Sequence, residues 1–238
     1  MKKLTSLLGA SVFALSAFAA SATPINVSGV TWDPDAPLDF RAQYDFAQQF
    51  DGSPAFAGTE LFGYGIVRSI NGTNESVFCT ACELTFQIGG FFTDGAGGFL
   101  QNQGFIRIFA DSTPDYDFSN DAMNAGTATN GTLWLELLAK DITFISLSPE
   151  PSNPYLTGFL SVSWLLGDIN ASAYNNFVAG TIFGNDASST SEASLVINNT
   201  FDGSGTIRAT TIPEPASLAI LGLGLLGMGA LSRRRRKA

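Results

Sequence analysis

Short apolar or alternating runs, separated by Gly, Asn, Asp, Ser and Pro, fill the chain between residues 61 and 210. This spacing is typical of β-strands joined by tight turns, and no segment of this part shows a convincing helical period. Pairs such as Asn71-Gly72 and Asn130-Gly131 supply the positive φ angles that such turns require. The pattern predicts strands at 61–69, 77–79, 84–88, 105–110, 132–138, 142–147, 156–166, 177–182, 195–197 and 206–210.

These strands predict one all-β domain over residues 23–212. We expect an antiparallel β-sandwich of jelly-roll or immunoglobulin-like topology, with many of the 20 phenylalanines in its core. The proline-rich segment 148–154 is interpreted as a long loop, because neither side of it offers a self-contained set of strands. The Ser- and Ala-rich segment 185–194 is likewise predicted to be a loop.

The N-terminus has the three parts of a secretory signal peptide. Lys2 and Lys3 carry positive charge, residues 4–19 are apolar, and Ala20-Ser21-Ala22 provides the small residues that signal peptidases cut after. Residues 1–22 are therefore predicted to direct export and to be removed.

The C-terminus is organised in three further parts. Pro213-Glu214-Pro215 prevents a helix from continuing into the apolar run 216–231, and four arginines and a lysine follow at 233–237. The apolar run predicts a short transmembrane helix. Its length of about 24 Å is less than the hydrocarbon core of about 30 Å, so the bilayer must thin or flanking residues must enter it. Because basic residues stay on the cytoplasmic side of the inner membrane, the body is expected on its opposite, outer side.

This ending resembles the PEP-CTERM sorting signal of Gram-negative bacteria over residues 213–238. The resemblance implies that an exosortase recognises and processes the tail, then delivers the body to the cell surface or extracellular matrix. An ordinary single-span anchor is the alternative. The sorting and processing residues that the resemblance implies are Pro213, Glu214, Pro215, Arg233, Arg234, Arg235 and Arg236.

Charge and composition exclude several function classes. Between residues 23 and 212 there are 5 basic and 20 acidic residues, a net charge of −15, which repels nucleic acid and anionic lipid. The chain has no histidine, so Ser-His-Asp and Cys-His catalysis and histidine-ligated metal sites are excluded. We expect a protein that is not an enzyme, although a pair of carboxylates for glycoside hydrolysis stays open.

Cys79 and Cys82 form a Cys-Thr-Ala-Cys motif. In an exported chain this spacing predicts a disulfide that stiffens a turn. Redox work or free thiols are the alternatives, but a redox cysteine favours a helix N-terminus, whereas the flanking residues alternate as in a hairpin.

Acidic residues cluster at 33–39 and at 111–121. Asp115, Asp117 and Asp121 form a candidate calcium site, because together with Ser119 they occupy the first, third, fifth and seventh oxygen positions of an EF-hand-like loop. The pattern then departs, with Asn120 where glycine belongs and Gly126 where the bidentate glutamate belongs, so a solvated acidic loop is the alternative. No cofactor other than this candidate Ca²⁺ is expected.

The tryptophans bear on sugar binding. Trp134 and Trp164 lie within strand patterns and are expected in the core, whereas Trp32, beside Asp33-Pro34-Asp35, is the best candidate for an exposed platform. The resemblance implies a non-catalytic surface or matrix protein associated with exopolysaccharide, biofilm or floc formation. The alternative is a secreted carbohydrate-binding or carbohydrate-active protein.

Overall fold

The computed structural model describes residues 23–37, 39–147, 157–179, 186–197 and 200–212. The predicted signal peptide, the sorting tail from residue 213 and the predicted loop 148–154 lie outside these residues. Residues Pro24–Ile212 form one compact unit, and its main hydrophobic core extends from Ile25 to Ala209. The body therefore has a core of its own. Within the described part of the chain, no helix is long and apolar enough to span a bilayer.

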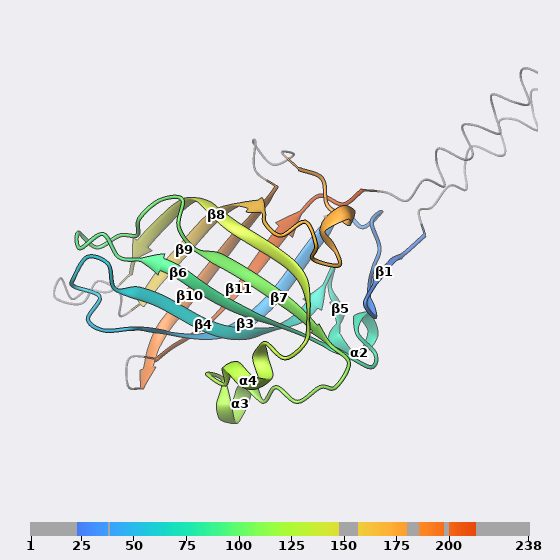
Figure 1. Ribbon diagram of the computed structural model, residues 1–238, viewed down its shortest axis with the longest axis horizontal. Helices are drawn as coiled ribbons and strands as arrows, with labels where there is room; N and C mark the ends of the chain where they lie inside the picture. The colour runs from blue at the N-terminus through green and yellow to red at the C-terminus, as the bar shows by residue number, and fades with distance from the viewer. Residues whose placement is uncertain (1–22, 38, 148–156, 180–185, 198–199, 213–238) are drawn as a thin grey trace, which may run out of the picture. The chain divides into compact units, whose positions relative to one another are not determined.

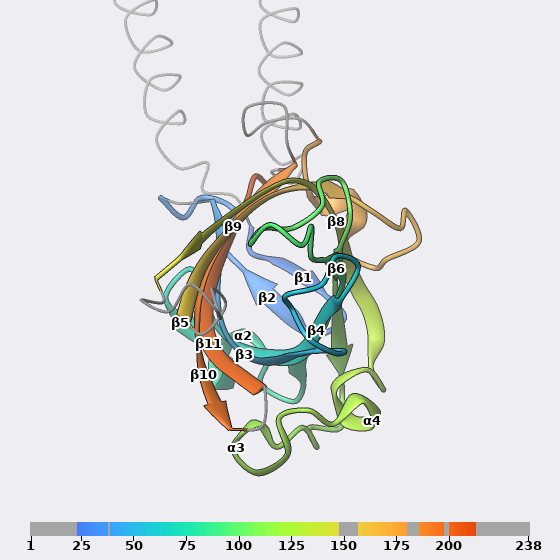
Figure 2. The same cartoon turned by 90° about the vertical axis from the view of Figure 1, so that its left-hand side faces the viewer.

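Eight long strands form the main sheet (Figure 1). They are β3 (Phe40–Phe50), β4 (Glu60–Ile70), β6 (Glu83–Phe92), β7 (Phe105–Asp111), β8 (Thr132–Ser146), β9 (Thr157–Leu166), β10 (Ala187–Ile197) and β11 (Thr200–Ala209). Each pairs antiparallel with the next along the chain, and β11 pairs back onto β3. The result is a closed up-and-down barrel, seen nearly end-on in Figure 2.

The all-β class is confirmed, but the predicted sandwich is wrong. A sandwich consists of two stacked sheets, whereas here the first and last long strands pair and close a single sheet. Tyr44 of β3 pairs with Gly205 of β11 on one side and with Val67 of β4 on the other. Alternation could not separate the two folds, because both direct every second residue of a strand into a shared interior. The closing pair joins residues too far apart in sequence for a local pattern to reveal it.

Large and small side chains alternate around the barrel interior. A Cβ at Gly65 would overlap the ring of Phe86, and one at Gly205 would overlap the ring of Tyr44. The inward positions of β10 are small for the same reason: Ala187, Ser189, Ser191 and Ala193. The prediction of a loop at 185–194 is therefore wrong over β10, because this strand buries small residues against large ones from other strands and lacks an apolar signal.

One end of the barrel is closed by aromatic side chains. The hairpin of β1 (Ile25–Val27) and β2 (Val30–Trp32) folds over this end, where Trp134 Nε1 donates to the carbonyl of Val27 at 3.2 Å. Trp32 stacks on Phe177 with ring centroids 5.9 Å apart, and meets Phe40 and Trp134 edge-on. Trp32 is only 3% exposed, so its prediction as an exposed platform is wrong.

Several local predictions also differ from the structure. The predicted strand 77–79 is replaced by a helical turn, α2 (Glu75–Phe78), beside the short β5 (Thr73–Asn74). The predicted strands 132–138 and 142–147 are one strand, β8, with a register shift between Ala139 and Asp141. Over its described part, the predicted strand 177–182 contains only an isolated bridge from Phe177 to Thr211, after the 3-10 turn η1 (Tyr174–Asn176).

Cys79 and Cys82 are joined by a disulfide, with their Cα atoms 5.0 Å apart. Cys79 follows α2 and Cys82 immediately precedes β6, and both are buried in the main core. The bridge therefore fixes the turn that leads from α2 into the barrel wall at the end covered by β1 and β2.

We expect Phe177→Ala to lower the free energy of unfolding by about 3 kcal/mol, since it removes a buried ring from the aromatic closure. Phe177 is 3% exposed, whereas Phe56 is 71% exposed and provides a matched control. Phe56→Ala should change stability by less than about 0.5 kcal/mol. Urea unfolding of both variants measures the difference, and equal effects would contradict this account of the closed end.

Candidate functional site

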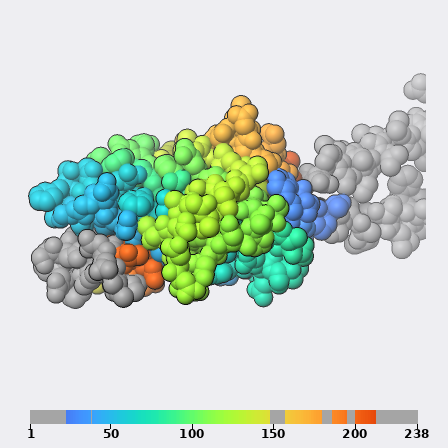
Figure 3. All heavy atoms as spheres, turned by 60° about the horizontal axis from the view of Figure 1, so that its bottom comes forward, coloured from blue at the N-terminus to red at the C-terminus, as the bar shows by residue number. Residues whose placement is uncertain are grey.

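An excursion between β7 and β8, residues 112–131, covers the outer face of β4 and β6. It contains two short helices, α3 (Phe118–Asp121) and α4 (Ala125–Ala128). Tyr116 and Ala128 pack against Tyr64 and Ile66 of β4, and Thr85 Oγ1 of β6 donates to the Ala128 carbonyl at 2.8 Å. Figure 3 shows these yellow-green residues raised over this face. A second, smaller apolar cluster thus holds the excursion against the barrel wall.

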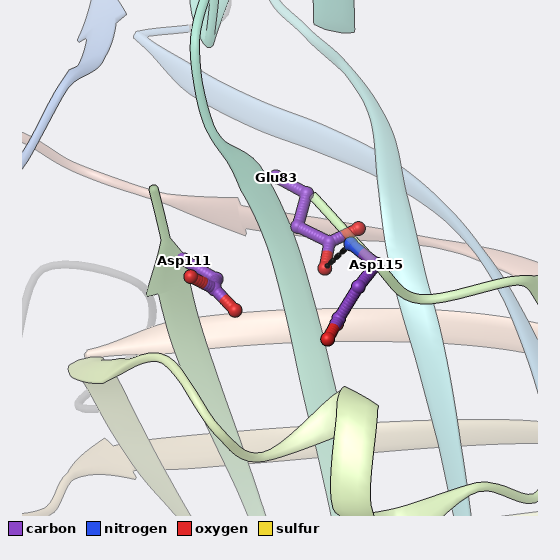
Figure 4. Close-up of side chains that lie close together, drawn as sticks. All are labelled: Glu83, Asp111 and Asp115. Atoms are coloured by element: carbon purple, nitrogen blue, oxygen red, sulfur yellow. Dashed lines mark hydrogen bonds between the residues drawn. The ribbon is translucent and has the colours of Figure 1, made fainter. Parts of the chain in front are cut away.

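Three carboxylates converge where the excursion begins (Figure 4). Glu83 of β6 and Asp111 of β7 are direct cross-strand partners, and Asp115 follows in the excursion. One oxygen from each lies within 4.8 Å of the others. Glu83 and Asp111 are buried and Asp115 is exposed. Among the described residues, this is the one group of three or more acidic side chains or cysteines close enough to share a metal ion.

The Glu83 carboxylate is held by backbone donors. Glu83 Oε1 accepts from the Asp115 N–H at 3.0 Å and from the Tyr116 N–H at 3.1 Å. Burial raises the pKa of Glu83; these two hydrogen bonds lower it, and the charges of Asp115 and Asp111 raise it further. The net effect is a raised pKa, and no ion pair forms between Glu83 and a basic side chain of the described residues.

The structure does not bring the predicted calcium residues Asp115, Asp117 and Asp121 together. Asp117 caps α3 by accepting from the Ser119 and Asn120 N–H groups, and a side-chain hydrogen bond from Asn120 helps to lower its pKa. Asp121 accepts from Asn124 Nδ2 at 2.8 Å. Asp115 instead joins Asp111, which belongs to the same acidic cluster of the sequence, and Glu83, which the sequence analysis did not connect with them because it lies on another strand.

The geometry of the carboxylate cluster suits a cation better than catalysis on a sugar. Calcium takes six to eight oxygen ligands, and three carboxylates would supply part of such a set. Glu83 has the raised pKa that a general acid needs, but it is only 2% exposed beneath the excursion. A glycosidic oxygen therefore has no approach to Glu83 in this arrangement.

The barrel interior offers little room for a ligand. Two cavities of about 30 and 20 Å³ lie among the described inward side chains, and both are lined by Gln48, Leu61, Leu160 and Ser191. A cavity of this size has room for about one or two water molecules. The aromatic side chains that fill an eight-stranded barrel leave its outer surface as the larger area for recognition.

Residues 211–236 match the family model described as the PEP-CTERM protein-sorting motif. The match confirms the assignment made from the Pro-Glu-Pro triplet, the apolar run and the arginine cluster. It covers the tail alone and implies export and processing by an exosortase. No curated protein matches the chain significantly.

We expect Glu83→Gln to raise stability at neutral pH and to have little effect in acid. A carboxyl whose pKa is raised by folding stabilises the native state below its unfolded pKa, and this contribution is lost as the pH rises through the folded pKa. Glutamine keeps an oxygen for the Asp115 and Tyr116 N–H groups while removing the charge. Urea unfolding of both proteins from pH 3 to 8 tests this, and parallel curves would contradict it.

A divalent cation would offset the same repulsion. At pH 7 we expect CaCl2 to raise the Tm of the wild type by several degrees, and that of Glu83→Gln by much less. Asp117→Asn is the matched control, because Asp117 caps α3 and does not belong to the cluster. Equal shifts in all three proteins would place any calcium elsewhere.

Proposed function

Because the chain carries a PEP-CTERM sorting motif and is an exosortase substrate, we propose that its processed body is a non-catalytic component of the cell surface or extracellular polysaccharide matrix. The sorting motif is the observation that carries the proposal. Before processing, the apolar run anchors the body at the inner membrane. Afterwards the body acts in exopolysaccharide, biofilm or floc formation, with the exopolysaccharide or surface matrix as its partner.

The last two residues before the Pro-Glu-Pro triplet, Thr211 and Ile212, are hydrogen-bonded to the barrel. Thr211 donates from its N–H to the two carboxylate oxygens of Asp39 at 3.0 and 2.9 Å, and its hydroxyl also bonds this carboxylate. The Ile212 N–H donates to the Asn176 carbonyl at 2.8 Å. These contacts tie down the last residues before Pro213, so a cut beyond Ile212 does not remove either partner of these hydrogen bonds.

The chemistry of the body supports a non-catalytic role. The chain has no histidine. In the cluster of Glu83, Asp111 and Asp115, which belongs to the described residues, the carboxylate with a raised pKa is that of Glu83, and it lies under the excursion 112–131. A second candidate function, carbohydrate binding, is favoured by a hollow on the outer face lined by hydroxyl, amide and charged side chains. The candidate Ca²⁺ at Glu83, Asp111 and Asp115 would then have a structural role.

Proline substitution in the motif tests the sorting proposal. We expect the wild type to be recovered outside the cell with a mass that ends near Pro213 to Pro215, because the exosortase has removed the tail. The variant Pro213→Ala/Pro215→Ala should stay in the membrane fraction at its full C-terminal mass. Fractionation of the host followed by intact-mass measurement distinguishes the two.

The chain provides its own control, since Pro149-Glu150-Pro151 repeats the triplet without an apolar run behind it. Pro149→Ala/Pro151→Ala should be processed and delivered like the wild type. Recovery of the wild type with its arginines retained would reduce the tail to a plain membrane anchor and overturn the proposal. The matrix role alone would be overturned by a different pair of results: the wild type is delivered to the surface, but deletion of its gene changes neither the matrix nor cell aggregation.

A further inference from the structure

Two arginines face each other on the outer surface of the barrel. Arg41 of β3 and Arg208 of β11 are direct cross-strand partners. Neither forms an ion pair within the described part of the chain, whereas Arg68 pairs with Asp45 at 2.9 Å and Arg107 pairs with Glu136 at 2.7 Å. Like charges directly opposite each other destabilise a sheet. In a body with four acidic residues for each basic one, this arginine pair, Arg41 and Arg208, is uncompensated.

Neutral hydrogen-bonding residues lie on two sides of the arginine pair, and the nearest acidic residue along the chain, Asp39, has its carboxylate bonded to Thr211. Ser188 of β10 is the partner of Arg208 on its other side, and Gln43 and Thr206 form the next outward pair along β3 and β11. Arg41 Nε is buried and has no hydrogen-bond partner. A buried donor without an acceptor costs free energy that an anionic ligand would recover.

The backbone of Arg41 is fixed before any ligand arrives. Its N–H donates to Asn71 Oδ1 at 2.9 Å, and its carbonyl accepts from the Asn71 N–H at 2.8 Å. Asn71 Nδ2 also donates to the Asp39 carbonyl at 2.7 Å. Arg41 is therefore attached to a turn that ties β3 to β4, which lowers the ordering cost of binding at this point.

Two hollows that share Gln43 lie beside the arginine pair; Arg41 lines the first of them, and Arg208 lines neither. The first, of about 230 Å³, is lined by Arg41, Gln43 and Asn71 with Ala36, Pro37 and Gly72. Gln43 also lines the second and wider hollow, of about 550 Å³, which runs over the outer face of β3, β11, β10 and β9. Its outward side chains include Asp45, Arg68, Phe159, Thr190, Glu192, Ser204 and Thr206. From Arg41 to Asp45 the strand advances about 13 Å, enough for a short oligosaccharide.

We infer that this face binds a polysaccharide that carries carboxylates. The arginine pair receives one carboxylate, because guanidinium groups match the geometry of its two oxygens. Sugar rings then follow the second hollow, where hydroxyl, amide and carboxylate groups bond their hydroxyls and the half-buried ring of Phe159 offers an apolar contact. The inference rests on the proposed matrix role and names the chemical class of the matrix partner.

The net charge of −15 does not prevent such binding. Repulsion between separated charges is screened over about 8 Å at physiological ionic strength. Of the two carboxylates that line the second hollow, Asp45 is paired with Arg68, which leaves Glu192 beside the sugar hydroxyls and the arginine pair as the source of attraction for the carboxylate. Repeated units of one polysaccharide engage many copies of the protein at the surface, which raises the overall strength of attachment.

The test uses the body, residues 23–212, in native gels cast with polygalacturonate or with uncharged dextran. We expect polygalacturonate to retard the wild type and dextran to leave its mobility unchanged. Arg41→Gln/Arg208→Gln should weaken the apparent affinity for polygalacturonate at least tenfold. Arg107→Gln, which removes a cation on the opposite wall beside Phe105, is the control and should bind like the wild type.

Thermal unfolding shows that the variants are folded and supplies a second readout. Without ligand, the double variant should be at least as stable as the wild type, since it removes a repulsive pair. Retardation that survives in the double variant, equal retardation by dextran, or none by either polymer would each overturn the inference. The matrix role is tested separately by deletion of the gene, so it can stand when this binding site fails, and the reverse also holds.

Discussion

Strand β3 is the element on which closure depends. It pairs with β4 through the register from Ala42 to Phe50, and with β11 from Phe40 to Gln49. Without either pairing, the sheet would have two open edges whose backbone groups lack partners, and its aromatic interior would meet water. Closure of the sheet through β3 gives these backbone groups hydrogen-bond partners and also encloses the core. A register shift between Gln43 and Tyr44 lets β3 bend from one neighbour to the other.

Closure has consequences for both ends of the barrel and for its interior. Glycines at 65, 203 and 205 make room for the rings of Phe86, Phe46 and Tyr44, so the interior is filled by side chains. The β1–β2 hairpin and the Cys79–Cys82 bridge lie at the end where Trp32, Phe40, Trp134 and Phe177 pack together. Thr211 and Ile212, the first two residues matched by the sorting motif, are hydrogen-bonded to Asp39 and Asn176.

Because side chains fill the interior, the polymer contact that we propose lies on the outer wall. The excursion 112–131 covers the wall at β4 and β6 and buries Glu83, while β3, β11, β10 and β9 present a polar surface that the described residues leave uncovered, with Gln43 linking it to the hollow lined by Arg41. These two faces suit different tasks. The covered face is suited to a structural cation, and the uncovered face has the size and chemistry of a polymer contact.

The sequence by itself determined that the protein carries an export and sorting motif, that its body is all-β and that histidine chemistry is absent, because the sorting motif, the alternation and the absence of histidine are properties of contiguous residues or of composition. Alternation also marks β3, where Phe40, Ala42, Tyr44 and Phe46 point inward, although the sequence analysis missed it. Only the tertiary structure decided that the sheet closes, that Trp32 is buried, that Asp115 joins Glu83 and Asp111, and that Arg41 faces Arg208. Each of these depends on which distant strands become neighbours. A period of two specifies the face of each side chain but carries no information about its partner across the sheet.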